Sequence, residues 1–145
     1  MASCIQNRSE NEVVVVVKPW SDEKKPVLKE QYRKAIEDYI EPYRLINTKV
    51  TVESARYAGI CVHGKIALEQ DSPKTRKAVL ERISRELSYT ERKHPFGTVI
   101  SYGQLFTALE NTEGVKKVLE LNLERTGNAA KKNDRGDVLL DADAL

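Results

Sequence analysis

The central stretch 48–70 alternates apolar and polar positions on both sides of a glycine. Val50 and Val52 alternate with Thr51 and Glu53 before Gly59. After the glycine, apolar side chains recur two or four residues apart: Ile60, Val62, Ile66 and Leu68. Period-two alternation on each side of a turn is typical of a β-hairpin. We therefore predict two paired strands joined by a tight turn at residues 58–59, in the middle of the fold.

The segment before this stretch predicts a strand followed by a helix. Residues 13–17 are five valines, a run that suits a central strand buried on both faces. Pro26 is expected to open the helix, and Pro42 to end or kink it. Apolar residues then recur at spacings of three and four, as on one helix face: Leu28, Tyr32, Ala35, Ile36, Tyr39, Ile40 and Tyr43. We expect this stripe, its tyrosines included, to pack in the core.

A second helix, a short helix and a last strand follow. Ser72 and Pro73 have the residue types of an N-cap and a first helical position. The buried stripe of this helix is expected to hold Ala78, Val79, Leu80, Ile83 and Leu87. Ser101 and Gln104 have capping-box spacing, and Gly114 is placed to close the short helix. The strand 115–125 alternates its apolar residues Leu119, Leu121 and Leu123 with Glu120, Asn122 and Glu124.

The order of these elements is strand, helix, strand, strand, helix, short helix, strand. This order predicts an α+β fold with the split βαβ sheet of ferredoxin-like proteins, both long helices lying on one face. The first and third strands would be central, and the other face would stay open. The boundaries expected are a flexible N-terminal segment or edge strand at 1–12, the domain at 13–125, and a flexible loop with a tail or edge strand at 126–145.

Composition narrows the classes of function. The chain has 145 residues and a formal charge of +2, from 24 basic and 22 acidic side chains. This balance does not predict nucleic acid or an anionic membrane as a partner. Cys4 and Cys61 are too few for a disulfide framework. No stretch has the roughly 20 apolar residues of a membrane helix, and the N-terminus lacks an apolar signal core, so a cytoplasmic protein is expected.

Three sequence patterns suggest a nucleotide-binding, metal-binding or catalytic site, and each lacks a residue or group that such a site requires. Residues 59–65 match the start of a phosphate-binding loop, but the next position is Ile66 where Ser or Thr holds magnesium. Cys61 and His63 share a strand face, yet His94 and Cys4 do not complete a zinc spacing with them. A nucleophilic pair of Cys61 and His63 lacks an orienting third group and an oxyanion site. We predict no catalytic residue, no cofactor and no metal, and keep a hydrolase or transferase using this pair as the weakest alternative.

Proteins of this topology also include two classes of binding domain. RNA-binding domains of this fold stack bases on aromatic residues of the central strands. The runs 13–17 and 60–68 contain no aromatic residue, which argues against RNA. A small-molecule or regulatory binding domain remains the main alternative, because such sites use loops and backbone groups that leave little trace in a sequence.

A series of turn and apolar motifs runs from residue 13 to residue 145. The segments are 13–19 (VVVVVKP), 21–23 (SDE) with Pro26, 39–44 (YIEPYR), 47–52 (NTKVTV), 95–100 (PFGTVI), 102–105 (YGQL), 109–110 (LE), 113–115 (EGV), 136–138 (GDV), Leu140 and 144–145 (AL). Together they resemble the C-terminal part of baseplate J-like proteins, wedge components of contractile phage tails and related injection machines. Members of that family are usually much longer.

The resemblance implies a structural role without catalysis. Such a domain binds neighbouring baseplate or tail subunits, with self-association possible. It is assembled in the cytoplasm of a prophage or phage host and becomes part of a tail or tail-like particle. Trp20 is the best anchor for a protein interface, with a lid over the helix–sheet core as the equal alternative. Phe96 is a second interface candidate, for which a core position is favoured.

Overall fold

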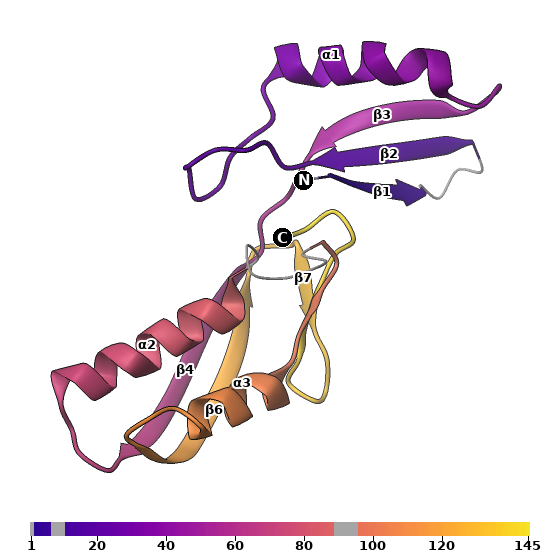
Figure 1. Ribbon diagram of the computed structural model, residues 1–145. Coiled ribbons are helices and arrows are strands. Elements are labelled where there is room, and N and C mark those ends of the chain that lie inside the picture. The colour runs from indigo at the N-terminus through magenta and orange to yellow at the C-terminus, as the bar shows by residue number, and fades with distance from the viewer. Residues whose placement is uncertain (1, 7–10, 89–95) are drawn as a thin grey trace. The chain divides into compact units, whose positions relative to one another are not determined.

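The computed structural model describes residues 2–6, 11–88 and 96–145 (Figure 1). These residues form a mixed α+β structure, which confirms the predicted class. The chain divides into two compact units between Tyr57 and Ala58, inside the segment 13–125 that was expected to be one domain. Unit 1 comprises Met1–Tyr57 and Ala142–Ala144, and unit 2 comprises Ala58–Asp141 and Leu145.

Unit 1 is a three-stranded sheet with one helix. The strand order is β1 (Ala2–Gln6), β2 (Glu12–Val17), β3 (Lys49–Ser54), with β1 antiparallel and β3 parallel to β2. Helix α1 (Glu30–Ile40) connects the parallel pair and packs against β3, as a βαβ crossover requires. The valine run therefore does form a central strand, with Val16 fully buried. β1 lies at one edge of this sheet.

The two prolines near α1 differ in their effect. Pro42 lies in the 3-10 turn η1 (Glu41–Tyr43) that directly follows the last α-helical residue, so the predicted break is confirmed. Pro26 does not open the helix, which begins four residues later at Glu30. Instead Pro26 is buried, and its carbonyl oxygen accepts a hydrogen bond from the Tyr57 hydroxyl at 2.8 Å. Packing in the loop, not helix initiation, explains this proline.

The predicted hairpin at 48–70 is wrong. β3 pairs with β2, whereas β4 (Gly59–Leu68) pairs with β6 (Val115–Thr126) in another sheet. Gly59 is not a turn residue, because it is the first residue of β4 and lies opposite Thr126. Alternation identified both strands correctly, but alternation carries no information about which strand is the partner. Within the described residues the strands form three sheets, with orders β1-β2-β3, β4-β6 and β5-β8-β7, in place of the single ferredoxin-like sheet.

Unit 2 is built on the long antiparallel pair of β4 and β6. Helix α3 (Tyr102–Glu110) packs on β6, and α2 (Pro73–Leu87) packs on α3. The third sheet has β8 (Val138–Leu140) between β5 (Val99–Ile100) and β7 (Ala130–Lys132). β8 is thus an inner strand, whereas the C-terminal tail was expected at an edge. The core of this unit includes Leu105, Leu109, Val118, Leu123 and Val138.

A β-bulge in β6 shifts the predicted alternation. Lys65 lies opposite Glu120 and Ile66 lies opposite Val118, so Leu119 is an extra residue on β6. Leu119 is consequently 59% exposed, while Val118 faces the core. Leu123 is fully buried as its alternation indicated, but the same pattern was wrong at Leu119. Strand alternation therefore holds only on one side of the bulge.

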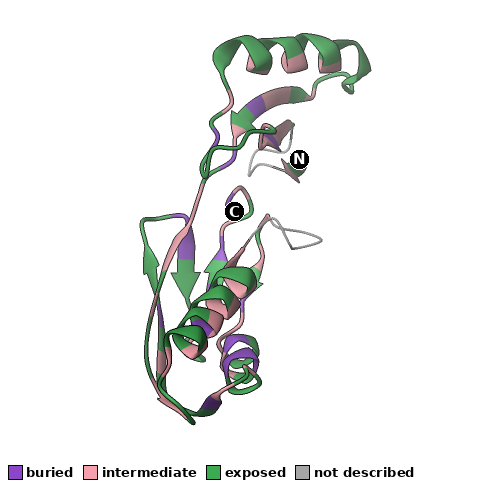
Figure 2. Cartoon of the chain, turned by 60° about the vertical axis from the view of Figure 1, so that its left-hand side comes forward, coloured by how far each residue is buried: buried purple, intermediate pink, exposed green. Residues whose placement is uncertain are grey.

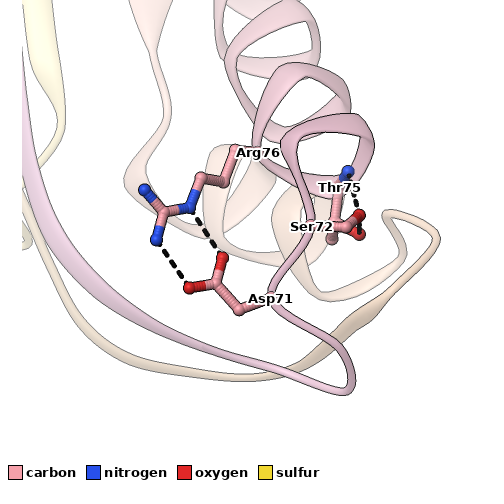
Figure 3. A network of polar contacts seen from close by, with 4 residues as sticks. All are labelled: Asp71, Ser72, Thr75 and Arg76. Carbon is pink, nitrogen blue, oxygen red and sulfur yellow. Dashed lines mark hydrogen bonds and ion pairs between the residues drawn. The ribbon is translucent and has the colours of Figure 1, made fainter.

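The start of α2 was predicted correctly. The Ser72 hydroxyl accepts a hydrogen bond from the Thr75 backbone N–H at 3.1 Å, and Pro73 is the first helical residue (Figure 3). Beside this cap, the Asp71 carboxylate accepts two hydrogen bonds from the Arg76 guanidinium, at 2.6 and 2.5 Å. The stripe of α2 is less buried than expected, since Val79 is buried but Leu80 is 66% exposed.

The short helix α3 is capped by two side chains. The Ser101 hydroxyl accepts a hydrogen bond from the Gln104 N–H at 3.4 Å, which agrees with the predicted cap. The Asp137 carboxylate accepts a further one from the Tyr102 N–H at 2.9 Å, tying the β7–β8 turn to the helix. Gly114 does not close this helix, which ends at Glu110. It has a φ of 83° and lies just before β6.

Candidate functional site

The Cys61–His63 pair lies on an open strand face. Both side chains are exposed on β4, on the same face as Lys65. The Lys65 ammonium pairs with Glu120 at 2.9 Å, and His63 Nε2 lies 3.7 Å from the Glu124 carboxylate. These are solvent-exposed cross-strand pairs of the kind that stabilise antiparallel sheets. No enclosed reaction site surrounds Cys61 and His63 among the described residues.

The resemblance of residues 59–65 to a phosphate-binding loop has a structural explanation. Residues 59–65 lie entirely within β4, where no helix follows to hold a phosphate. A Cβ atom on Gly64 would come within 2.6 Å of the backbone oxygen of Glu120 on β6. The glycine is therefore required for the close approach of the two strands, and the match to a nucleotide-binding motif is coincidental.

The metal-ligand candidates are not brought together by the described part of the chain. Cys4 is exposed on β1 in unit 1, while Cys61 and His63 are on β4 in unit 2. His94 lies outside the described residues. Among the residues that are described, no group of three or more His, Cys, Asp or Glu side chains could hold a metal ion. No helix among them is long and apolar enough to cross a membrane.

Shifted pKa values occur at structural contacts. The hydrogen bonds from Arg76 lower the pKa of Asp71. The hydrogen bond from Asn133, and then the one from the Tyr102 N–H, lower the pKa of Asp137. Both carboxylates thus stay charged at helix starts, where the helix dipole favours a negative group. Neither contact has the form of a catalytic acid or base.

Several depressions lie on unit 2, and one of them is lined by two helices and a strand. Its volume is about 190 Å³. Pockets for drug-sized ligands usually measure about 300–1,000 Å³. Its lining comes from α2, β5 and α3: Glu86, Leu87, Thr98, Val99, Ile100, Ser101, Gln104 and Leu105. This depression is smaller than that range, whereas two more open hollows of unit 2, of about 500 and 570 Å³, fall within it.

Unit 1 instead exposes many large apolar side chains. The tyrosines of α1 were predicted to lie in the core, and this prediction is wrong: Tyr39 is 72% and Tyr43 is 76% exposed. The narrow sheet meets only the side of α1 that carries the half-buried Ile36 and Ile40. Figure 2 shows the exposed remainder of the helix in green. We define the α1 surface as its exposed tyrosines with the two apolar residues that follow: Tyr32, Tyr39, Tyr43, Leu45 and Ile46.

The end of the α1 surface is held in place by local contacts. The Tyr39 and Tyr43 rings are neighbours on the helix, with centroids 5.8 Å apart. Next in the chain, Arg44 pairs with Glu41 at 2.8 Å and donates a hydrogen bond to the Thr48 backbone oxygen at 3.2 Å. The loop that carries Leu45 and Ile46 is thereby tied to both of its ends. This ordered arrangement of exposed apolar groups is typical of an interaction site.

The two interface residues predicted from the sequence differ in exposure. Trp20 is 98% exposed in the loop between β2 and α1, so it is not a lid over the core. Phe96 is half-buried at the start of a described segment. Sequence reasoning named Trp20 but missed the α1 surface, because helical spacing alone does not tell a buried stripe from an exposed one.

Comparisons with known proteins identify a similar fold. No protein-family model matches the sequence, and no curated protein matches it. Among solved structures, the chain is similar to a chain in the cryo-EM structure of the anti-feeding prophage baseplate, six-fold symmetrised. The TM-score is 0.68 at 14% sequence identity, over 93% of this chain and 28% of the other. The two proteins therefore share a fold, and this chain spans little more than a quarter of the length of its neighbour.

Proposed function

We propose that this protein is a structural subunit of a phage-tail-like baseplate, where it binds neighbouring subunits and catalyses no reaction. The observation that carries the proposal is the fold shared with a baseplate chain over 93% of the sequence. A likeness of such extent includes both compact units, so it does not rest on one common motif. In this comparison the chain matches 28% of the larger baseplate polypeptide.

The finer assignment is to the C-terminal region of baseplate J-like proteins. The sequence motifs between residues 13 and 145 support it, and the fold of the baseplate neighbour agrees with it. Under this proposal the chain is assembled in the cytoplasm and becomes part of a phage tail or a tail-like particle. Its partners are baseplate and tail proteins, and neither nucleic acid nor a membrane is among them.

The α1 surface and Trp20 are the proposed contact points in unit 1. Aromatic side chains are enriched in the buried centres of protein interfaces, and tryptophan and tyrosine are frequent hot spots. Tyrosines offer a large contact area with few rotatable bonds, so little entropy is lost when they are covered. The charged neighbours Glu41 and Arg44 already neutralise one another, which lowers the electrostatic cost of covering the patch. Phe96 stays a second contact residue in unit 2.

The absence of catalysis is part of the proposal. Cys61 and His63, the most reactive pair in the sequence, lie on an open face beside paired charges. A nucleophile needs a base within hydrogen-bond reach and donors placed around the developing oxyanion. Among the described residues, the face of β4 and β6 forms an open hollow beside His63 and offers no such enclosure.

Co-purification with tail proteins tests the proposal. The chain would be co-expressed with the baseplate proteins encoded beside its gene and analysed by size-exclusion chromatography with light scattering. We expect a complex of defined mass. A Tyr39→Ser/Tyr43→Ser variant should weaken it at least tenfold, whereas Leu80→Ser, which removes an equally exposed apolar side chain of unit 2, should not. A chain that stays monomeric with every such protein would contradict the assignment.

A further inference from the structure

Strand β4 has a long edge that no described strand covers. Its ten residues pair with β6 on one side, and the two strands form a sheet of their own (Figure 1). At 3.4 Å per residue, this edge is about 34 Å long. Alternate backbone N–H and C=O groups along such an edge point away from the partner strand and can bind another strand.

The outer edge of β3, next to α1, is protected in a way that the edge of β4 is not. On β3, the Glu37 carboxylate accepts a hydrogen bond from the Val52 N–H at 3.2 Å. Natural edges are also protected by proline, by bulges or by several charges. β4 contains no proline, its only lysine is Lys65, and the extra residues of both register shifts belong to β6. The main chain of β4 is thus regular, and none of the described strands pairs with its free side.

β6 shows what kind of strand suits β4. On the exposed face, Glu120 and Glu124 of β6 lie near Lys65 and His63. On the opposite face, Leu123 of β6 lies beside Val62 and is fully buried. A strand on the free side would meet the same two faces of β4. It would therefore place acidic side chains beside His63 and Lys65, and apolar ones beside Val62 and Ile66.

A second copy of β4 does not meet this requirement. β4 contains no acidic residue, so a second copy cannot place one beside His63 or Lys65, and antiparallel pairing centred on Lys65 would put two ammonium groups opposite one another. Like charges directly opposite one another destabilise a strand pair. Charge complementarity therefore favours a different chain over self-association.

We propose that the free edge of β4 binds an extended segment of a partner protein, by main-chain pairing, whose side chains alternate apolar and acidic. This is the strand-addition mode of peptide recognition, in which backbone hydrogen bonds give affinity and alternate side chains give specificity. The inference does not depend on the baseplate role, since it follows from the edge, the faces and the charges of β4.

Synthetic peptides test the inference on the full chain. The probes are an eight-residue peptide of alternating valine and glutamate and its valine–lysine counterpart, followed by NMR-detected hydrogen exchange. We expect the glutamate peptide to bind at least tenfold more tightly and to protect alternate amides of β4. In the Lys65→Glu variant the preference should shift toward the lysine peptide. Absence of binding, or protection confined to other elements, would refute the proposal.

N-methylation provides a control that leaves the protein unchanged. Two versions of the glutamate peptide would carry methyl groups on the backbone nitrogens of either the odd or the even residues. In a strand pair, only every second N–H group of the peptide donates a hydrogen bond to β4. The version methylated at those nitrogens should lose at least tenfold in affinity, while the other version binds nearly unchanged. Equal binding by both versions would show that the peptide does not pair as a strand, and would overturn the inference.

Discussion

The ring centroids of Tyr39, in α1, and Tyr43, in the following turn η1, lie 5.8 Å apart, and both side chains are largely exposed. Replacing both with serine removes little buried area, so the free energy of unfolding should change by no more than about 0.5 kcal/mol. Urea denaturation measures this directly. Leu109→Ala serves as the contrast, because Leu109 is fully buried and its truncation should cost about 2–5 kcal/mol. A similar loss for the tyrosine pair would place both rings in the core.

Gly64→Ala should destabilise unit 2. The added methyl group would meet the Glu120 backbone oxygen at 2.6 Å, which forces the two strands apart. Overpacking of this kind costs about 1–3 kcal/mol. Gly103→Ala is the matched control, since the nearest atom to its Cβ is Ser101 Oγ at 3.9 Å and the residue is helical. Alanine should stabilise that position by about 0.5–1 kcal/mol, so thermal unfolding of the two variants should shift in opposite directions.

The bulge in β6 predicts unequal effects at adjacent residues. Val118 faces the core, so Val118→Ala should lower the stability by roughly 1–3 kcal/mol. Leu119 is the extra, exposed residue, and Leu119→Ala should change the stability by less than about 0.5 kcal/mol. Chemical denaturation of both variants checks the register. A larger loss of stability for Leu119→Ala than for Val118→Ala would mean that β6 alternates without a bulge and that Leu119 faces the core.

Asp137 should make stability depend on pH at the start of α3. Its pKa is lowered in the folded state by the hydrogen bonds from Asn133 and the Tyr102 N–H. A lowered pKa stabilises the fold above the unfolded value of 3.8, and this contribution is lost as the pH falls through the folded value. Asp137→Ala should therefore lower the melting temperature at pH 6, and the difference from wild type should shrink at pH 3 and below.

A control at a neighbouring acid isolates that effect. Asp134 is exposed in the same turn, with no hydrogen bond from Asn133 or Tyr102 to its side chain. Asp134→Ala should leave the melting temperature nearly unchanged at pH 6 as well as at pH 3. If the deficit of Asp137→Ala were the same at both pH values, the charge of Asp137 would not contribute to folding.

Local sequence rules located most elements. Capping residues gave the start of α2 at Ser72 and of α3 at Ser101, because a hydroxyl followed by suitable first-turn residues satisfies local donors. Pro42 marked the end of α1 through its missing donor. These signals act within a few residues, and that is why a sequence reveals them.

The sequence did not reveal the features that depend on residues distant in the chain. The strands β3 and β4 alternate equally well, yet they pair with β2 and β6, which are distant in the chain. The bulge at Leu119 depends on the register with β4, and the exposure of Tyr39 and Tyr43 depends on the width of the sheet beneath α1. For the candidate site, the sequence identified Trp20 from its residue type, but only the packing of unit 1 revealed the α1 surface.

Cryo-EM of tail-like particles, purified from cells that produce this protein, tests the central claim most directly. We expect mass spectrometry to detect the chain in the particles, and its two units to fit density in the baseplate, with Tyr39, Tyr43 and Trp20 at contacts with neighbouring subunits. Complete particles whose baseplate contains no density for this fold, and which assemble normally when its gene is deleted, would contradict it.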